Sequence, residues 1–447
     1  MTSAVVADPA PQERPWKLAV VWLVVLGALF FSTYGAANWL ASQRAGVGSL
    51  VFGWEREIPF WALTIVPYWA IDALYGISLF ICATRSELMA HVKRLSSAQA
   101  IAIACFIAFP LHFTFARPQT DGLFGSMFDV LMGFDQPYNQ APSLHIILLV
   151  ILWVRYAKHV PPAGRWLLHA GFFLIGVSVL TTYQHHFIDI PTGLWVGWLC
   201  IWLFPENAPS IPSRFSLTGD SRRRWIACMY ALGSLGTAMV AFTVGGAAIF
   251  LLWISGSLLL VAVIYLALDE TAFQKNPDGT MNAAAWWLFA PYFIGAWINS
   301  RAWTHADKRV DRVDSGVMLG RMPTAGDLAE AGIGSVVDLT AELPFASRGL
   351  AYRNVPMLDL TLPTEAQLAN AARAIEEALA EGPTLVCCAL GYSRSALACA
   401  AWLLLTGRAG TVEEALMRLR QARPSVVILE GHVLLLRQFA AANGGVR

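Results

Sequence analysis

The chain has 447 residues, of which 56% are hydrophobic and only 14% are charged, a composition that excludes an ordinary soluble globular protein. The apolar residues are gathered into blocks, which predicts a membrane protein with a soluble end. The net charge of +1 argues against a nucleic-acid partner held by bulk charge. Seven cysteines imply no disulfide framework, and no metal-ligand spacing stands out, so we expect neither a metal nor a cofactor.

The first 205 residues divide into a tail and a membrane domain. Residues 1–16 are polar and rich in proline, which predicts a disordered tail. The apolar block that opens residues 17–205 is too long for a removed signal peptide and lacks its cleavage pattern, so we interpret it as a retained span. The spans expected in this domain are residues 17–39, 60–82, 98–116, 143–158, 167–185 and 188–204.

Three further segments lead to the soluble end. Residues 206–224 form a basic linker, and residues 225–268 predict a two-span hairpin with a hinge at its double glycine. Residues 269–306 form a connector whose tryptophan-rich part, 283–300, either spans the membrane or lies in its interface. We favour the interfacial helix, because one more span would move the following domain to the outer side, where its reactive thiol is exposed to oxidation.

Residues 307–447 carry the most specific motif, a cysteine and an arginine at the two ends of one loop. A short apolar run before Cys388 and a long one after Ser395 predict a strand, a tight loop and a helix. Unpaired backbone N–H groups at the start of such a helix suit an anion. Arg394 offers a planar fork to phosphate oxygens, and both features favour the thiolate of Cys388. A thiolate that faces a phosphate is a nucleophile for phosphoryl transfer.

The spacing of Cys388, Arg394 and Ser395 resembles the signature of the cysteine-dependent protein tyrosine phosphatase superfamily, and residues 307–447 look like its α/β dual-specificity branch. The resemblance implies that Ser395 assists release of the thiolate and that Asp359 is the general acid. The position before the nucleophile is cysteine here, whereas the family usually has histidine. The loop residues implied to bind the phosphate are Ala389, Leu390, Gly391, Tyr392 and Ser393.

A second set of polar residues falls at the ends of predicted spans on one side of the membrane domain. Polar residues in spans are costly and are functional candidates by default. His185 and Asp189 would share one helix face if their segment is helical, and the carboxylate would then orient the imidazole for attack on phosphorus. In this scheme His145 protonates the leaving oxygen and Arg117 holds the phosphate. Spacing alone also allows His186 in place of His185.

These residues resemble the type-2 phosphatidic acid phosphatase superfamily, whose fold is shared with vanadium haloperoxidases. The resemblance covers roughly residues 20–205, selects His185 as the nucleophile, and places Ser143 in the substrate-binding set. Two cations of the family pattern are missing, because Pro110 and Val179 stand in their places. A site with fewer cations suits a phosphodiester, as in the similar sphingomyelin and inositol phosphorylceramide synthases. Hydrolysis and transfer to another lipid alcohol both remain open.

Together these features predict a six-helix phosphatidic acid phosphatase-like membrane domain with two or three extra spans, followed by an α/β phosphatase domain. We expect a two-site lipid-phosphate phosphatase or phosphotransferase of phospholipid metabolism, whose partners are lipid substrates and membrane lipids. Loop charges predict a multi-pass protein with the cysteine site cytoplasmic and the histidine site facing outward. The resemblance to fused proteins of this kind in bacteria implies a bacterial inner membrane. The alternatives are a membrane-anchored protein phosphatase and a non-catalytic lipid-binding protein with decayed sites, and the oligomeric state stays open.

Overall fold

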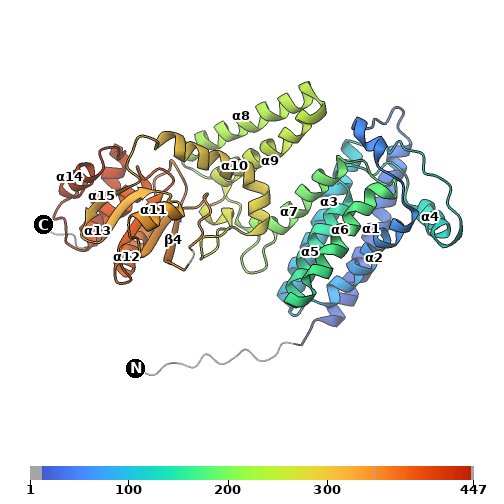
Figure 1. Ribbon diagram of the computed structural model, residues 1–447, viewed down its shortest axis with the longest axis horizontal. Coiled ribbons are helices and arrows are strands. Elements are labelled where there is room, and N and C mark those ends of the chain that lie inside the picture. The colour runs from blue at the N-terminus through green and yellow to red at the C-terminus, as the bar shows by residue number, and fades with distance from the viewer. Residues whose placement is uncertain (1–12, 348, 444–447) are drawn as a thin grey trace. The chain divides into compact units, whose positions relative to one another are not determined.

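The computed structural model describes residues 13–347 and 349–443, and it consists of two compact units, Met1–Arg214 and Phe215–Arg447 (Figure 1). Residues 1–12 of the predicted tail, residues 1–16, lie outside the described residues, and Trp16 at its end already opens the first helix.

The first unit is a bundle of helices in which α5 is in contact with α2, α3, α6 and α7. Gly193 and Gly197 of α7 lie so close to α5 that an added Cβ atom would be 2.8 Å from the Cβ of Ile146 or Val150. Small residues at this spacing let two helix backbones approach, as in other membrane proteins. The bounds are α1 (Trp16–Ser42), α2 (Ile65–Phe80), α3 (Arg85–Ala108), α4 (Gly122–Phe134), α5 (Leu144–His159), α6 (Arg165–Thr181) and α7 (Asp189–Leu203).

The prediction of a span over residues 98–116 is wrong in position. The helix here is α3, which begins thirteen residues earlier and ends at Ala108, so Arg117 lies on an extended segment and not at a helix end. Thr84 caps the start of α3, because its side chain accepts a hydrogen bond from Glu87 N at 3.1 Å. Pro110 follows the last turn and cannot continue the helix.

The segment before α7 also differs from expectation. Residues 182–188 form turns, and Tyr183 has a φ of 53°. His185 and Asp189 therefore do not share a helix face, because Asp189 is the first residue of α7. The turn nevertheless brings their side chains together, as described below.

Within the described residues, five helices are long and apolar enough to cross a membrane, and the expected spans at α3, α5 and α7 are not among them. α5 and α7 have 16 and 15 residues, which at 1.5 Å per residue is roughly 24 Å and shorter than a bilayer core of about 30 Å. A spanning six-helix core is thus not confirmed. The five helices are Trp16–Ser42, Ala62–Phe80, Pro162–Thr181, Ser221–Val244 and Gly246–Ala267.

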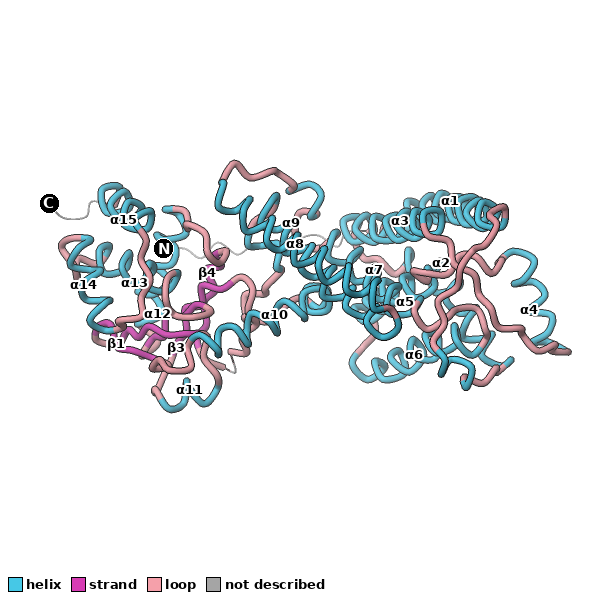
Figure 2. Tube along the Cα trace, turned by 90° about the horizontal axis from the view of Figure 1, so that it is seen from above, coloured by secondary structure: helices cyan, strands magenta, loops and turns pink. Residues whose placement is uncertain are grey.

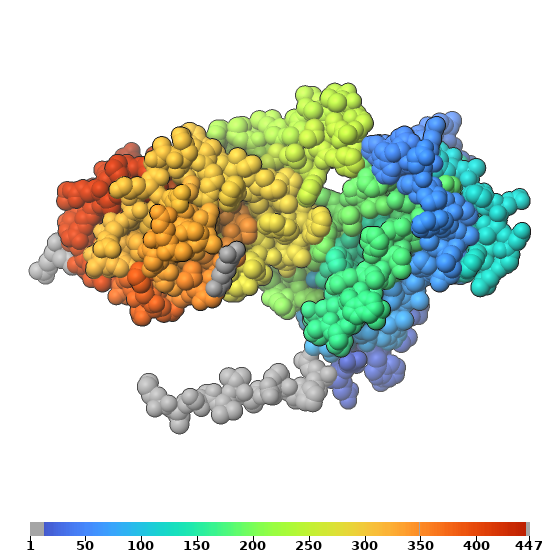
Figure 3. Space-filling view, viewed as in Figure 1, coloured from blue at the N-terminus to red at the C-terminus, as the bar shows by residue number. Residues whose placement is uncertain are grey.

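The second unit begins with an apolar hairpin, α8 (Ser221–Val244) and α9 (Leu251–Ala267). The two helices lie side by side, and Gly245, with a φ of +67°, makes the turn between them. Ser234 and Ser255 form a hydrogen bond of 3.0 Å between the helices. The closed end of the hairpin stands out from the α/β domain (Figures 1 and 3). The start of α8 and the end of α9 therefore both lie toward that domain.

The tryptophan-rich segment forms α10 (Ala283–Trp303), which is bonded to the α/β domain at both ends. Just before α10, the carbonyl of Gly279 accepts a hydrogen bond from Phe345 N at 2.8 Å. Near its end, the hydroxyl of Ser300 donates to the carbonyl of Ala389. A helix tied to one domain at both ends does not carry that domain across a bilayer. This arrangement favours the interfacial helix over a span.

The α/β domain is built on a five-stranded sheet with the order β1-β2-β5-β3-β4, in which only the edge strand β1 is antiparallel. Helices cover both faces, as a parallel sheet requires (Figure 2). The α/β fold expected for this domain is confirmed. The strands are β1 (Val310–Asp314), β2 (Val317–Arg321), β3 (Ser335–Thr340), β4 (Ala351–Met357) and β5 (Thr384–Cys388).

The helix α13 forms the centre of the larger core, since its residues 394–404 are all buried. A helix that is apolar on nearly every side belongs in an interior, and here it packs against β5 and α12. The carboxyl ends of β3, β4 and β5 meet above the start of α13, the usual place for a site in a parallel sheet. The remaining helices are α11 (Ala325–Glu330), α12 (Glu365–Leu379), α14 (Val412–Ala422) and α15 (Glu430–Ala442).

The packing of α7 on α5 gives a testable prediction. We expect Gly197→Ala to lower the free energy of unfolding by about 1–3 kcal/mol, because the new methyl group would overlap Val150. The control is Gly171→Ala in α6, where no atom lies within 4 Å of the added Cβ, and this change should be neutral or slightly stabilising. Thermal unfolding in detergent compares the two, and equal midpoints would contradict the close helix contact.

Candidate active site

The cysteine loop connects the end of β5 to the start of α13. Cys388 is the last residue of the strand, and Arg394 is the first residue of the helix. Gly391 has a φ of +76°, and an added Cβ atom would lie 2.5 Å from the backbone carbon of Gly320. Only glycine satisfies both conditions, so the loop can fold tightly against β2.

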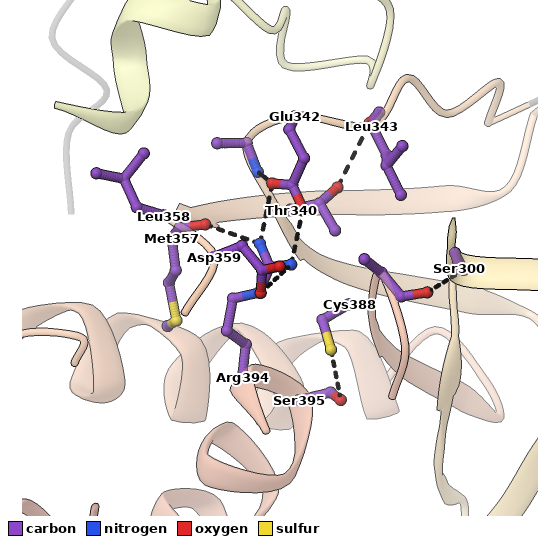
Figure 4. A network of polar contacts seen from close by, with 12 residues as sticks. Ser300, Thr340, Glu342, Leu343, Met357, Leu358, Asp359, Cys388, Arg394 and Ser395 are labelled. Carbon is purple, nitrogen blue, oxygen red and sulfur yellow. Dashed lines mark hydrogen bonds and ion pairs between the residues drawn. The ribbon is translucent and has the colours of Figure 1, made fainter. Parts of the chain in front are cut away.

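The sulfur of Cys388 is buried inside this loop (Figure 4). The backbone N–H of Gly391 donates to it at 3.2 Å, and the hydroxyl of Ser395 lies 3.3 Å away. Both groups stabilise negative charge on sulfur through hydrogen bonds. The thiol predicted to be the nucleophile therefore lies where an anion is favoured.

Arg394 is held in place by carboxylates on two neighbouring loops (Figure 4). Its two terminal nitrogens pair with both oxygens of Glu342 at 2.9 and 2.7 Å, and Nη2 also lies 2.9 Å from Asp359. Nη1 donates in addition to the carbonyl of Met357 at 3.0 Å. Nε is buried and has no hydrogen-bond partner within the described residues. One donor of the guanidinium is thus free for a phosphate oxygen.

The pKa values of Glu342 and Asp359 are shifted in opposite directions. Burial raises the pKa of Glu342, but the ion pair with Arg394 outweighs burial and the net shift is downward, so Glu342 is ionised. Burial raises the pKa of Asp359 more than Arg394 lowers it, so this carboxyl retains a proton to higher pH than a free aspartate. A raised pKa suits a group that must give a proton to a leaving oxygen.

The walls of the loop are fixed by residues from outside it. The Leu390 carbonyl accepts a hydrogen bond from Arg423 at 3.5 Å, and Ala389 accepts one from Ser300. The hydroxyl of Tyr392 donates to Asp307 at 2.6 Å. Ser393 is the N-cap of α13, although its side chain makes no capping bond. The loop residues predicted to bind phosphate therefore form a rigid cradle around the cysteine.

The cysteine that replaces the usual histidine, Cys387, points to the other face of the sheet. It packs in the smaller core with Leu385 and Val336 and is completely buried. Burial, assisted by Asp338, raises the pKa of its thiol well above the ordinary value. Cys387 therefore stays protonated and does not compete with Cys388.

Sequence reasoning missed several groups that hold the predicted residues. Glu342 comes two residues after β3, the buried strand that lies next to β5 in the sheet. A carboxylate directly after a buried strand was the sequence feature that could have indicated its place in the site. Tyr265 in α9 donates to the carbonyl of Asp359 at 3.1 Å, and Arg222 in α8 donates to the carbonyl of Leu360. These contacts join residues 94 and 138 positions apart in the chain, and no local pattern indicates them.

In the first unit, three of the predicted histidine-site residues are in contact. Nδ1 of His185 lies 3.0 Å from Asp189, and its Nε2 lies 3.1 Å from the hydroxyl of Ser143. All three side chains are buried. A carboxylate on one ring nitrogen fixes the tautomer, so the other nitrogen faces the hydroxyl at the start of α5.

The neighbouring His186 has a different environment. Its Nδ1 lies 3.0 Å from Glu55, and its Nε2 accepts a hydrogen bond from the backbone N–H of Thr114 at 3.2 Å. The ring of His186 is also stacked on Phe113 with the ring centres 4.5 Å apart. Both nitrogens of His186 therefore have partners, as both nitrogens of His185 do, so hydrogen bonding alone does not decide between the two histidines.

Arg117 and His145 are the other two residues of the predicted histidine site. Arg117 donates to the carbonyls of Thr182 and Tyr183 at 3.2 and 3.4 Å. His145 stacks on Tyr68 with the ring centres 4.2 Å apart. Its Nε2 is buried and has no partner among the described residues. The structure thus joins Arg117 to the turn that carries the histidines, but no hydrogen bond between described residues links it or His145 to His185.

Residues 317–442 match the family described as dual specificity phosphatase, catalytic domain. No curated protein matches the chain. Among solved structures, Tk-PTP in the active form is 30% identical, with coverage of 30% of this chain and 98% of that chain and a TM-score of 0.28.

Two further solved structures are similar over the same part. Human DUSP28 is 29% identical, with coverage of 31% of this chain and 96% of that chain and a TM-score of 0.28. PTPMT1 in complex with PI(5)P is 22% identical, with coverage of 31% and 97% and a TM-score of 0.28. The family match includes the cysteine loop and Asp359, and the first unit lies outside it. The C-terminal domain is a dual-specificity phosphatase catalytic domain, and the chain is therefore a phosphatase.

Proposed function

We propose that the cysteine site removes a phosphate monoester from a membrane lipid at the surface of the bilayer that holds the α8–α9 hairpin. The observation that carries the proposal is the bonding of the general-acid loop to the hairpin, through Tyr265 to Asp359 and through Arg222 to Leu360. When a helical hairpin enters a bilayer, the start of its first helix and the end of its second helix lie at the same membrane surface. The loop bonded to those ends is then at the depth of the lipid headgroups.

The rim of the site supports the same conclusion. Leu360 and Leu362 of the acid loop expose about half of their surface, 55% and 51%, and Val427 and Leu429 across the site are similarly exposed. The backbone N–H of Val427 bonds to the cysteine loop at Tyr392, which places this segment beside the site. Exposed apolar side chains around a polar centre mark a surface that contacts lipid or a partner. The neighbouring hairpin favours lipid.

The chemistry follows from the positions of three groups. The sulfur of Cys388 forms a bond to phosphorus while the bond from phosphorus to the lipid oxygen breaks. Asp359 gives its proton to that oxygen, and the free Nε and the shared Nη2 of Arg394 bind the phosphoryl oxygens. Water then attacks the phosphocysteine, the sulfur–phosphorus bond breaks, and Asp359 takes back a proton. Inorganic phosphate and the lipid alcohol are the products.

The site argues against one alternative function, a non-catalytic protein, and is compatible with the other, a protein phosphatase. A non-catalytic protein with decayed sites is set aside, because the C-terminal domain keeps the cysteine, the arginine and the aspartate of its family. A membrane-anchored protein phosphatase uses the same groups and differs only in its substrate, so the experiment below includes a phosphopeptide. The cytoplasmic face of a bacterial inner membrane is the proposed location, since all seven cysteines are unpaired and the mechanism needs a free thiol.

A second candidate activity belongs to the histidine site. We propose that His185 attacks a phosphodiester headgroup, either for hydrolysis or for transfer to a lipid alcohol. Support comes from its Nε2, which is directed to Ser143 while Asp189 holds the other nitrogen. Arg117 is the nearest predicted cation, and the Asp135 carboxyl is close: burial raises its pKa, whereas His185 and Arg117 lower it. One cation among carboxylates suits a singly charged diester better than a dianion.

The first activity is tested with the full chain reconstituted in vesicles that contain phosphatidylglycerophosphate or a phosphatidylinositol monophosphate. We expect phosphate release from the lipid at a kcat/KM at least roughly tenfold above that for a phosphotyrosyl peptide. Cys388→Ser should reduce it by roughly 10⁴-fold. The control Cys228→Ser changes an exposed cysteine of α8 and should be neutral. A preference for the peptide would contradict the lipid proposal but not the phosphatase.

The second activity is tested by headgroup release from vesicles of phosphatidylinositol or phosphatidylethanolamine. We expect His185→Asn to abolish release without effect on the cysteine site, because the attacking nitrogen is lost. His186→Asn is the control: it should lower the unfolding midpoint through loss of the Glu55 pair, yet leave activity per folded molecule within about threefold. Equal loss in both variants would contradict the assignment, as would release that depends on Cys388.

A further inference from the structure

We propose that the α8–α9 hairpin is a working part of the phosphatase, in which Tyr265 and Arg222 position the loop that carries the general acid. Their two donors approach from different helices, and their acceptors are the consecutive carbonyls of Asp359 and Leu360. The inference concerns the acid step and does not depend on the identity of the substrate.

The acid loop needs such support because of its backbone. Leu360 has a φ of 59°, in the left-handed region, which is unfavourable for a residue with a Cβ atom. The side chain of Leu360 is 55% exposed and contributes little packing in return. A strained residue persists only where its surroundings determine its conformation. Here the surroundings include the two hydrogen bonds from the hairpin.

The donors are themselves fixed within the hairpin. Tyr265 is 1% exposed and its ring packs against Tyr230 at 5.7 Å between centres. Arg223, next to Arg222, donates to the carbonyls of Tyr265, Ile264 and Leu268 and so closes the end of α9. The start of α8 and the end of α9 are therefore bonded to each other and move together. Any displacement of the hairpin changes both contacts with the acid loop.

A third contact ties the far side of the loop to the chain that follows α9. Gln367, in the first turn of α12, donates to Glu270 at 2.8 Å and to the carbonyl of Pro356 at 3.2 Å. Pro356 lies just before the acid loop, in β4. The hairpin thus bonds to the loop at Asp359 and Leu360, and the chain after the hairpin is linked to Pro356 through Gln367. Seating of the hairpin in the bilayer then sets the position of Asp359 relative to Cys388.

Loss of this positioning should lower the turnover of some phosphate substrates and leave that of others nearly unchanged. A positioning defect at the acid affects substrates whose leaving oxygen must be protonated, such as alkyl phosphates. It has little effect on an aryl phosphate whose leaving group departs as an anion. Attack by Cys388 does not involve the hairpin contacts, and Arg394 keeps its two bonds to Glu342, which follows a central strand. A general loss of folding would instead lower turnover of both substrates equally.

The test uses the full chain in detergent with a soluble short-chain alkyl phosphate and a difluorinated umbelliferyl phosphate. We expect Tyr265→Phe with Arg222→Gln to lower kcat for the alkyl phosphate by roughly 10–100-fold and kcat for the aryl phosphate by less than about threefold. Asp359→Asn should show the same pattern, more strongly. Restoration of the cation in Tyr265→Phe with Arg222→Lys should recover part of the loss.

The matched control is Thr243→Val with Arg224→Gln, which removes one hydroxyl and one guanidinium from the same hairpin. Thr243 bonds to Met239 and Arg224 bonds to Gly219, both away from the acid loop, so both substrates should be turned over as in the wild type. Equal loss on the two substrates in the Tyr265 and Arg222 variant would overturn the proposal, because it indicates a purely structural role. Unchanged turnover of the alkyl phosphate would overturn it as well.

The pH profile gives an independent readout. Burial raises the pKa of Asp359, so kcat for the alkyl phosphate should fall only at a higher pH than a free aspartate would give. Release of the loop exposes the carboxyl, lowers its pKa and should move the basic limb of the profile to lower pH in the Tyr265 and Arg222 variant. A limb that stays in place would count against the positioning role. Failure of the lipid substrate assay alone would leave this result unaffected.

Discussion

The buried guanidinium of Arg394 is the constraint on which the catalytic domain depends. A buried cation is unfavourable unless carboxylates and hydrogen bonds replace its water. Glu342 after β3 and Asp359 after β4 supply these groups, and Arg394 itself follows β5. They can meet only because β5, β3 and β4 are neighbours in the sheet. The strand order is therefore a condition for the site.

The same constraint explains how the membrane part and the chemistry are connected. Asp359 lies next to Leu360, whose backbone is strained, whereas Glu342 comes shortly after a central strand. The loop needs external support, and the hairpin provides it through Tyr265 and Arg222. The apolar helices are thus bonded to the residue proposed as the general acid. A simple tether would make no contact with the acid.

Sequence patterns predicted what depends on local structure. The apolar run, tight loop and second apolar run around Cys388 indicated the strand, cradle and helix. Glu342 and the hairpin donors could not be predicted, because their contacts depend on the order of the strands and on distant segments. The predicted third span failed for a local reason instead, since Thr84 and Pro110 set the ends of α3 more strongly than mean apolarity did. The family pattern selected His185 over His186, but the contact of His186 with Glu55, far away in sequence, could not be predicted from it.

The charge balance around Arg394 links substrate binding to the acid step. With Glu342 and Asp359 both ionised, the three groups carry a net negative charge, which opposes a phosphate dianion. Protonation of Asp359 removes that repulsion and frees Nη2 of Arg394 for a phosphoryl oxygen. A bound phosphate therefore favours the protonated acid, because the two compete for the same nitrogen. The form of Asp359 that binds substrate best is then the form that can protonate the leaving oxygen.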